Sequence, residues 1–161
     1  MRKELLIQTV NEFLKPHGFR KRGSSWYYTG DGLISVFNLQ KSIYSNLYYV
    51  NIGLFVDKDK IAVSPLPENK GDVKFRLNTL ADDELRSKIE STFDLESSID
   101  DSLRRQQIDE ILTQVVAPVF TNFLTLSDAS RYLTDIRIDS IGVITLEGRR
   151  ILQLEWTGRQ Q

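Results

Sequence analysis

Apolar and polar residues alternate with a period of two in several short segments of the first half of the chain. The alternation is strongest in residues 33–40 and 47–56, and a shorter version spans 73–77. This period is typical of β-strands, whose successive side chains point to opposite faces of a sheet. Aromatic residues on either side of Gly23 favour two further short strands. We therefore predict an antiparallel meander.

Other segments place apolar residues three and four positions apart, as an amphipathic helix does. The spacing predicts a first helix over residues 2–15, a second over 82–94 and a long third helix over 98–123. The third segment carries the broadest apolar stripe and is therefore expected to be the main packing helix. Pro118 lacks a backbone donor, so we expect that helix to kink or restart there. A short helix is expected near 127–133.

The C-terminal segment is rich in isoleucine and valine. Residues 136–144 and 151–156 are interpreted as strands around a turn at residues 147–149. Together these elements predict an α+β fold in one domain, residues 1–161, with an antiparallel sheet of four to six strands. The sheet is expected to pack against the long helix in the C-terminal half, supported by the two shorter helices.

The composition is that of an ordinary globular protein, with 40% hydrophobic and 27% charged residues. The formal net charge of −1 provides no overall attraction to phosphate backbones or anionic lipids. The chain has no cysteine, which excludes disulfides and favours a reducing compartment, so we expect a cytoplasmic protein. No apolar stretch has the 18 or more residues that a membrane-spanning helix needs.

One stretch carries a more specific pattern. A short amphipathic helix is followed by GFRKRGSSWYY and then by ISVFNLQKSIYSNLYYVNIGLFV. Over about residues 3–80 the chain resembles the bacterial domain-of-unknown-function family 4304. The resemblance rests on Gly18-Phe19, Lys21, Gly23, Trp26, residues 38–42, Tyr44 and residues 51–53. It implies an α+β fold in small bacterial proteins, some of them encoded near genes thought to specify toxin-immunity proteins, and it implies no established activity.

No catalytic constellation is visible in the sequence. His17 is the only histidine, so it has no second histidine for a relay or a metal site. The acidic groups at 57–59 and 82–84 are explained more simply by a charged loop and by a helix N-terminus. No phosphate-binding loop or dinucleotide fingerprint occurs. We therefore expect a protein that is not an enzyme and that needs no cofactor or metal.

Two groups of residues are candidates for binding. Arg20, Lys21 and Arg22 precede Trp26, and cations interleaved with aromatic residues are typical of single-stranded nucleic-acid binding. A charged sheet edge with a core-facing tryptophan would show the same pattern. Three polar residues in or just after apolar strands should be hydrogen-bonded, preferably to backbone and otherwise to a ligand. They are Gln40, Ser42 and Asn51.

Charge is divided unevenly along the chain. Residues 2–22 contain six basic and two acidic side chains, whereas residues 82–110 contain ten acidic and four basic ones. The acidic half could attract a basic protein such as a nucleic-acid-degrading toxin. Solvated acidic helices are the simpler interpretation. We therefore expect a protein-binding module, with toxin immunity as the narrower form of this expectation and nucleic-acid binding through residues 20–28 as the alternative.

Overall fold

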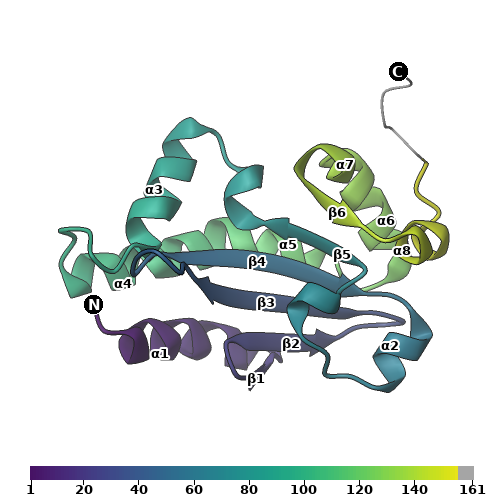
Figure 1. The fold of residues 1–161 in the computed structure, drawn as a ribbon, viewed down its shortest axis with the longest axis horizontal. Coiled ribbons are helices and arrows are strands. Elements are labelled where there is room, and N and C mark those ends of the chain that lie inside the picture. Colours follow the sequence, from purple (N-terminus) through teal and green to yellow (C-terminus); the bar gives the residue numbers. More distant parts are fainter. Residues whose placement is uncertain (156–161) are drawn as a thin grey trace.

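A computed structural model describes residues 1–155 and shows one six-stranded antiparallel sheet with helices packed on it (Figure 1). Each strand pairs with its neighbour in sequence, so the sheet is a meander in the order β1 to β6. The predicted α+β class and antiparallel sheet are confirmed. The strands are β1 (Arg20–Arg22), β2 (Ser25–Thr29), β3 (Ile34–Lys41), β4 (Tyr48–Phe55), β5 (Val73–Arg76) and β6 (Gly142–Ile144).

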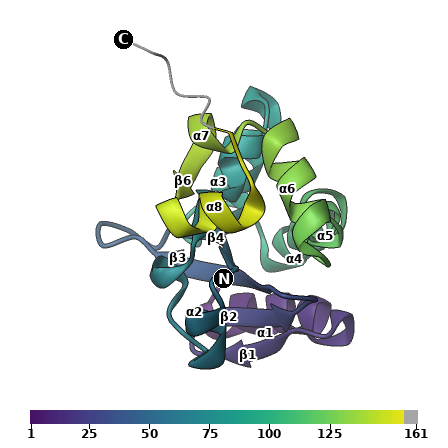
Figure 2. The ribbon, with the colours of Figure 1, turned by 90° about the vertical axis from the view of Figure 1, so that its right-hand side faces the viewer.

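Most of the helices lie on one face of this sheet, as the edge-on view shows (Figure 2). Side chains from this inner face and from the helices form one buried cluster, which contains Trp26 and Phe37 of the sheet and Val10 and Leu112 of the helices. The predicted helices are confirmed as α1 (Lys3–Leu14), α3 (Asp83–Phe93) and the pair α4 (Asp101–Ile111) and α5 (Ala117–Thr121). Asp82 and Asp100 accept backbone N–H groups at the starts of α3 and α4.

The irregularity predicted near Pro118 is a wider turn of the helix. Residues Leu112–Val116 form a π-helical turn between α4 and α5, and the N–H of Ala117 bonds to the carbonyl of Leu112, five residues earlier. Proline cannot donate to the carbonyl four residues before it, and its ring clashes with that carbonyl. A π-turn beside the proline is one way to relieve that conflict.

The predicted C-terminal hairpin is wrong. Residues 126–152 form α6 (Leu126–Asp135), α7 (Ile138–Ile141), the single strand β6 and α8 (Leu146–Leu152); residue 156 of the expected second strand lies outside the described residues. The glycine taken as a turn lies inside α8. A Cβ at Gly148 would be 3.0 Å from the Asp72 Cβ, so this glycine permits close packing rather than a turn.

The outer face of the sheet is covered at one end only. The segment that contains α2 (Lys58–Ala62) and the 3₁₀ turn Glu68–Lys70 lies against it, and Ile61 and Leu66 pack on a small cluster around Val36. The Tyr27 hydroxyl donates to the Leu66 carbonyl over 2.7 Å. The other end of the outer face remains open. Among residues 1–155, no helix combines the length and apolar character needed to cross a bilayer.

Candidate functional site

The structure separates the basic and aromatic residues that the sequence grouped together. Arg20 pairs with Tyr27 and Arg22 with Ser25, which places both exposed arginines on the outer face. Lys21 and Trp26 lie on the opposite face, where Trp26 is fully buried. The Trp26 indole N–H donates to Asn11 Oδ1 over 3.0 Å, and Lys21 Nζ lies 5.7 Å from the centre of its ring. Trp26 is therefore part of the core and unavailable for stacking on a base.

Gln40 and Asn51 meet on the outer face, in a row of hydrogen-bonded amide side chains. Asn51 Nδ2 donates to Gln40 Oε1 over 2.9 Å and to Asn38 Oδ1 over 3.1 Å. Asn38 Nδ2 donates in turn to Ser25 Oγ over 2.9 Å. The expected hydrogen bonds of Gln40 and Asn51 therefore come largely from neighbouring side chains rather than from strand-end backbone. The sheet register brings these groups together because paired residues on adjacent strands share a face.

Charged and aromatic groups border this amide row. The Arg76 guanidinium lies over the Tyr49 ring, 4.0 Å from its centre. Lys74 lies one outer-face position further along β5. Glu68 approaches the sheet above Gly53, and burial raises the pKa of its carboxyl although Lys74 acts in the opposite direction. Cationic side chains thus lie at both ends of the row, on β1 and on β5.

The third polar candidate, Ser42, begins the loop between β3 and β4. We call residues 42–47 the hairpin tip. Ser42 Oγ accepts the N–H of Tyr44 over 3.1 Å, and Ser45 Oγ accepts the N–H of Leu47 over 3.3 Å. The N–H of Ser42 also bonds to the Leu47 carbonyl over 2.8 Å. Serine side chains therefore satisfy two backbone N–H groups of the hairpin tip, as serine does in tight turns.

Contacts with the loop after α3 fix the base of the hairpin tip. Asn46 Nδ2 donates to Glu96 Oε1 over 3.1 Å, and the Asn46 carbonyl accepts the N–H of Leu95 over the same distance. Leu47 and Asp94 form an isolated β-bridge. The hairpin tip projects from the body of the molecule in Figure 2 while its base is anchored at several points.

The hairpin tip displays two large apolar side chains almost completely to solvent. Ile43 is 87% exposed and Tyr44 is 92% exposed, the highest values among the exposed large hydrophobic residues of the described chain. From the sequence, Ser42 was a candidate for binding and Tyr44 one of the residues of the family resemblance, but the exposure of Ile43 and Tyr44 was not predicted. The available signal was the occurrence of isoleucine and tyrosine in an otherwise polar turn, a position where neither side chain can reach the core.

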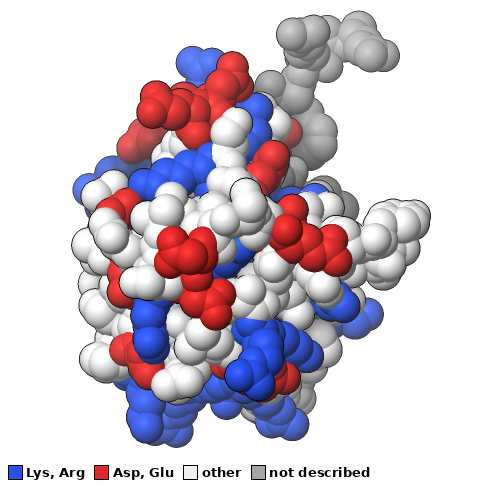
Figure 3. Space-filling model, turned by 90° about the vertical axis from the view of Figure 1, so that its left-hand side faces the viewer, with Lys and Arg blue, Asp and Glu red and all other residues white. Residues whose placement is uncertain are grey.

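Acidic groups flank the hairpin tip. Figure 3 shows aspartate and glutamate side chains on one side of the uncharged projection, lysine or arginine just below it, and charges of both signs over the upper part of this side. We call Asp94 and Glu96, which adjoin the base of the hairpin tip, the acidic rim. Other acids of residues 82–110 have local structural roles. Asp82 and Asp100 cap helices, and Glu110 pairs with Lys88.

The comparison with protein families assigns most of this chain. No curated protein and no solved structure matches it. The model of a domain of unknown function, DUF4304, matches residues 10–122, which is more than half of the chain and extends well past the resemblance expected over residues 3–80. The matched region holds the end of α1, the first five strands, the hairpin tip and the helices from α2 to α5, whereas α6 to α8 and β6 lie beyond it. The chain therefore belongs to the DUF4304 family.

Proposed function

We propose that this protein is a non-enzymatic protein-binding module whose principal contact is the hairpin tip. The observation that carries the proposal is the near-complete exposure of Ile43 and Tyr44 on a loop whose backbone is fixed by hydrogen bonds. Isolated exposed apolar residues are common on protein surfaces. A rigid projection that presents two adjacent ones is a much stronger indication of an interface.

Rigidity matters because association costs conformational entropy. A loop that is already ordered loses less freedom on binding than a flexible one, so more of its contact energy contributes to affinity. Tyrosine is also enriched among the residues that dominate interface energetics, because it combines a large apolar area with a polar end. Tyr44 is therefore expected to be the main anchor, with Ile43 beside it.

The acidic rim specifies the charge of the partner. Asp94 and Glu96 adjoin the base of the hairpin tip, so a complementary surface would hold an apolar pocket with lysine or arginine on the side that faces these two residues. A toxin that acts on nucleic acid would be basic, and toxin immunity is therefore the narrower form of this proposal. The cysteine-free composition supports a cytoplasmic site of action.

The proposal is tested by comparing two equally exposed apolar sites. A partner is first isolated by cross-linking to the wild-type protein, and affinities are then measured by calorimetry with the purified partner. Tyr44→Ala and Ile43→Ser should each weaken binding by about tenfold or more, as expected for anchor residues. Leu146→Ser is the matched control, because Leu146 is 82% exposed at the start of α8. Equal losses of affinity for all three variants, or no loss of affinity for the two hairpin-tip variants, would overturn the proposal.

The contribution of the acidic rim is measured separately, from the rates of association and dissociation. Asp94→Asn and Glu96→Gln should slow association and reduce its dependence on salt while changing dissociation little, because charges at an interface edge act mainly on encounter. The partner's surface should be basic where it meets these residues. An acidic partner, or association that is insensitive to salt, would contradict the proposed charge complementarity.

A second candidate function rests on the outer face of the sheet. Arg20 and Arg22 lie at one end of the amide row and Lys74 and Arg76 at the other, and the exposed Arg76 guanidinium, stacked on the half-buried Tyr49 ring, offers a planar group to a base. This arrangement supports nucleic-acid binding by the sheet, without the predicted stacking on Trp26.

Fluorescence anisotropy with single-stranded RNA and DNA separates this candidate from the first. Arg22→Ala and Arg76→Ala should weaken binding and lower its salt dependence. Arg131→Ala serves as the control, since this exposed arginine pairs with Asp128 on α6. Absence of binding at low salt would eliminate the nucleic-acid function.

A further inference from the structure

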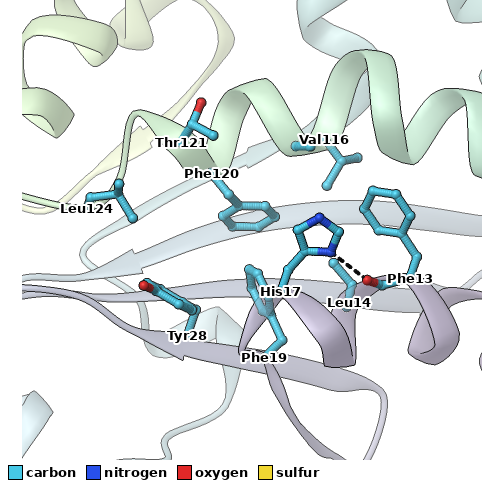
Figure 4. Close-up of a pocket in the computed structure, with 10 residues that line it drawn as sticks. Phe13, Leu14, His17, Phe19, Tyr28, Val116, Phe120, Thr121 and Leu124 are labelled. Carbon is cyan, nitrogen blue, oxygen red and sulfur yellow. Dashed lines mark hydrogen bonds between the residues drawn. The ribbon is translucent and has the colours of Figure 1, made fainter.

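A small pocket lies between the end of α1, the following 3₁₀ turn (Lys15–His17) and α5 (Figure 4). Its volume is about 130 Å³. Aliphatic side chains complete a wall that is mainly aromatic, and none of the lining residues belongs to the hairpin tip. The rings that line it are those of Phe13, His17, Phe19, Tyr28 and Phe120.

The rings are arranged to receive another ring. Phe19 and Phe120 meet edge to face, with centroids 4.9 Å apart at 68°, and Phe19 also contacts Tyr28 at 5.5 Å. The His17 imidazole is stacked on Phe13, with centroids 4.8 Å apart. Edge-to-face and offset arrangements are the favoured geometries of aromatic pairs. Further ring contacts of the same kind would be available to an aromatic occupant of this wall.

One hydrogen-bond acceptor, Nε2 of His17, faces this apolar space. His17 Nδ1 lies 2.7 Å from the Phe13 carbonyl oxygen. A carbonyl oxygen can only accept, so Nδ1 carries the proton and donates it. In the neutral imidazole, Nε2 is then an acceptor. Figure 4 shows this second nitrogen turned toward the space between Phe120 and Val116.

The remaining wall favours a neutral occupant. None of the lining residues is acidic, and Thr121 uses its hydroxyl proton for the Pro118 carbonyl. An aromatic box that recognises a cation usually gains from nearby negative charge, which this lining does not provide. A neutral ring with one donor to His17 Nε2 matches the polar groups better.

Size limits the occupant to a single ring. An engineered apolar cavity of about 150 Å³ binds benzene, and the present pocket has a volume of about 130 Å³. His17 and Thr121 are exposed, so the pocket can be reached from solvent. We propose that this pocket binds a small phenol, with its ring among Phe19, Phe120 and Tyr28 and its hydroxyl donating to His17 Nε2.

The π-turn beside Pro118 shapes the helix that forms one wall. It ends at Val116, and Ala117, Phe120 and Thr121 in the turn that follows line the pocket. The π-turn changes the direction in which the residues after Val116 point around the helix axis.

The direct test is titration of the wild-type protein with phenol, benzene and tetramethylammonium, followed by calorimetry and by the aromatic signals in NMR spectra. Phenol should bind saturably and about tenfold more tightly than benzene, because one neutral hydrogen bond distinguishes the two. Tetramethylammonium should not bind. No saturable phenol binding up to about 10 mM, the range in which a fragment of this size should be detected, would overturn the proposal.

Two kinds of variant localise the binding. His17→Phe keeps a ring but removes the acceptor, so it should abolish the preference for phenol over benzene, and the ratio of the two affinities is the readout. Ala117→Leu and the larger Ala117→Phe should fill the pocket and abolish binding of both, with native circular dichroism confirming that each variant is folded. Equal wild-type affinities for phenol and benzene, preference for the cation, or phenol binding that survives a folded Ala117 variant would each refute the assignment.

Discussion

Lys60 Nζ lies 2.6 Å from Oδ1 of Asp72, whose carboxylate is completely buried. Asp72 Oδ2 accepts the backbone N–H groups of Val56 and Asp57 over 2.9 and 3.0 Å. Thr145, the residue that caps the start of α8, donates its hydroxyl to Asp72 Oδ1 over 3.1 Å. One carboxylate therefore links the end of β4, helix α2 and the start of α8, and so connects the region matched by the family model to the C-terminal segment.

We predict that Asp72→Asn destabilises the protein by about 3–5 kcal/mol, because it leaves a lysine and two backbone donors without their charged acceptor. Denaturant unfolding at neutral pH measures the loss. Lys58→Ala is the control, since Lys58 is exposed on the same short helix α2. A loss below about 1 kcal/mol, as expected for a surface ion pair, would contradict this role of Asp72.

The same carboxylate predicts a pH dependence. Burial by itself would raise the pKa of Asp72, but hydrogen bonds from Lys60 and from the N–H groups of Asp57 and Val56 outweigh it and leave the pKa lowered. The resulting stabilisation is complete above the unfolded pKa of about 3.9 and disappears as pH falls through the folded pKa. The stability difference between wild type and Asp72→Asn should therefore narrow below about pH 4. A difference that is constant with pH would exclude the linkage.

Glu68 should show the opposite pH dependence. Burial raises the pKa of Glu68, so its ionisation costs stability as pH rises from the unfolded value of about 4.3 through the folded one. Glu68→Gln should stabilise the protein at neutral pH by less than about 1 kcal/mol, because solvent reaches a half-buried group. The variant and wild type should converge below about pH 4. Thermal unfolding at several pH values tests this, and destabilisation at neutral pH would contradict it.

Arg104 acts as a fully buried cap for the end of α3. Its Nη1 donates to the carbonyls of Thr92 and Asp94 over 2.7 and 2.6 Å, and its Nη2 donates to the Ser97 carbonyl over 3.0 Å. Arg104→Met should cost about 3–5 kcal/mol, since several buried carbonyls lose their donors at once. Arg105→Ala, which loses an exposed pair with Glu12, should cost less than about 1 kcal/mol. Similar costs for both arginines would argue against the capping role.

Gly142 determines whether β6 can join the sheet. A Cβ at this position would lie 2.4 Å from the Lys74 carbonyl oxygen and 2.9 Å from the Phe75 Cβ. Gly142→Ala should therefore separate β6 from β5 and destabilise the protein by about 1–3 kcal/mol. Hydrogen exchange should accelerate at residues 142–144 while β2, β3 and β4 stay protected. Unchanged protection at β6 would show that the strand tolerates the methyl group.

The local pattern of apolar and polar residues was sufficient to predict most helices and strands in the region that the family model matches. Alternation over residues 33–40 and 47–56 corresponds to β3 and β4, and apolar spacing near residues 2–15 and 82–94 corresponds to α1 and α3. These elements form where their own periodicity places the apolar side chains on one face, so the information lies within each segment. The absence of cysteine and the imbalance of charge along the chain were likewise visible without a structure.

Long-range packing decided the rest. Gly148 resembles a turn residue in sequence, and only its approach to Asp72 explains its place inside α8. The amide row depends on the register of β2, β3 and β4, and the orientation of Trp26 depends on which face of β2 meets the helices. The aromatic pocket joins Phe13 with Phe120, and the exposure of Tyr44 follows from the way the hairpin tip is anchored. No local period encodes such relationships, because they are set by contacts between residues distant in the chain.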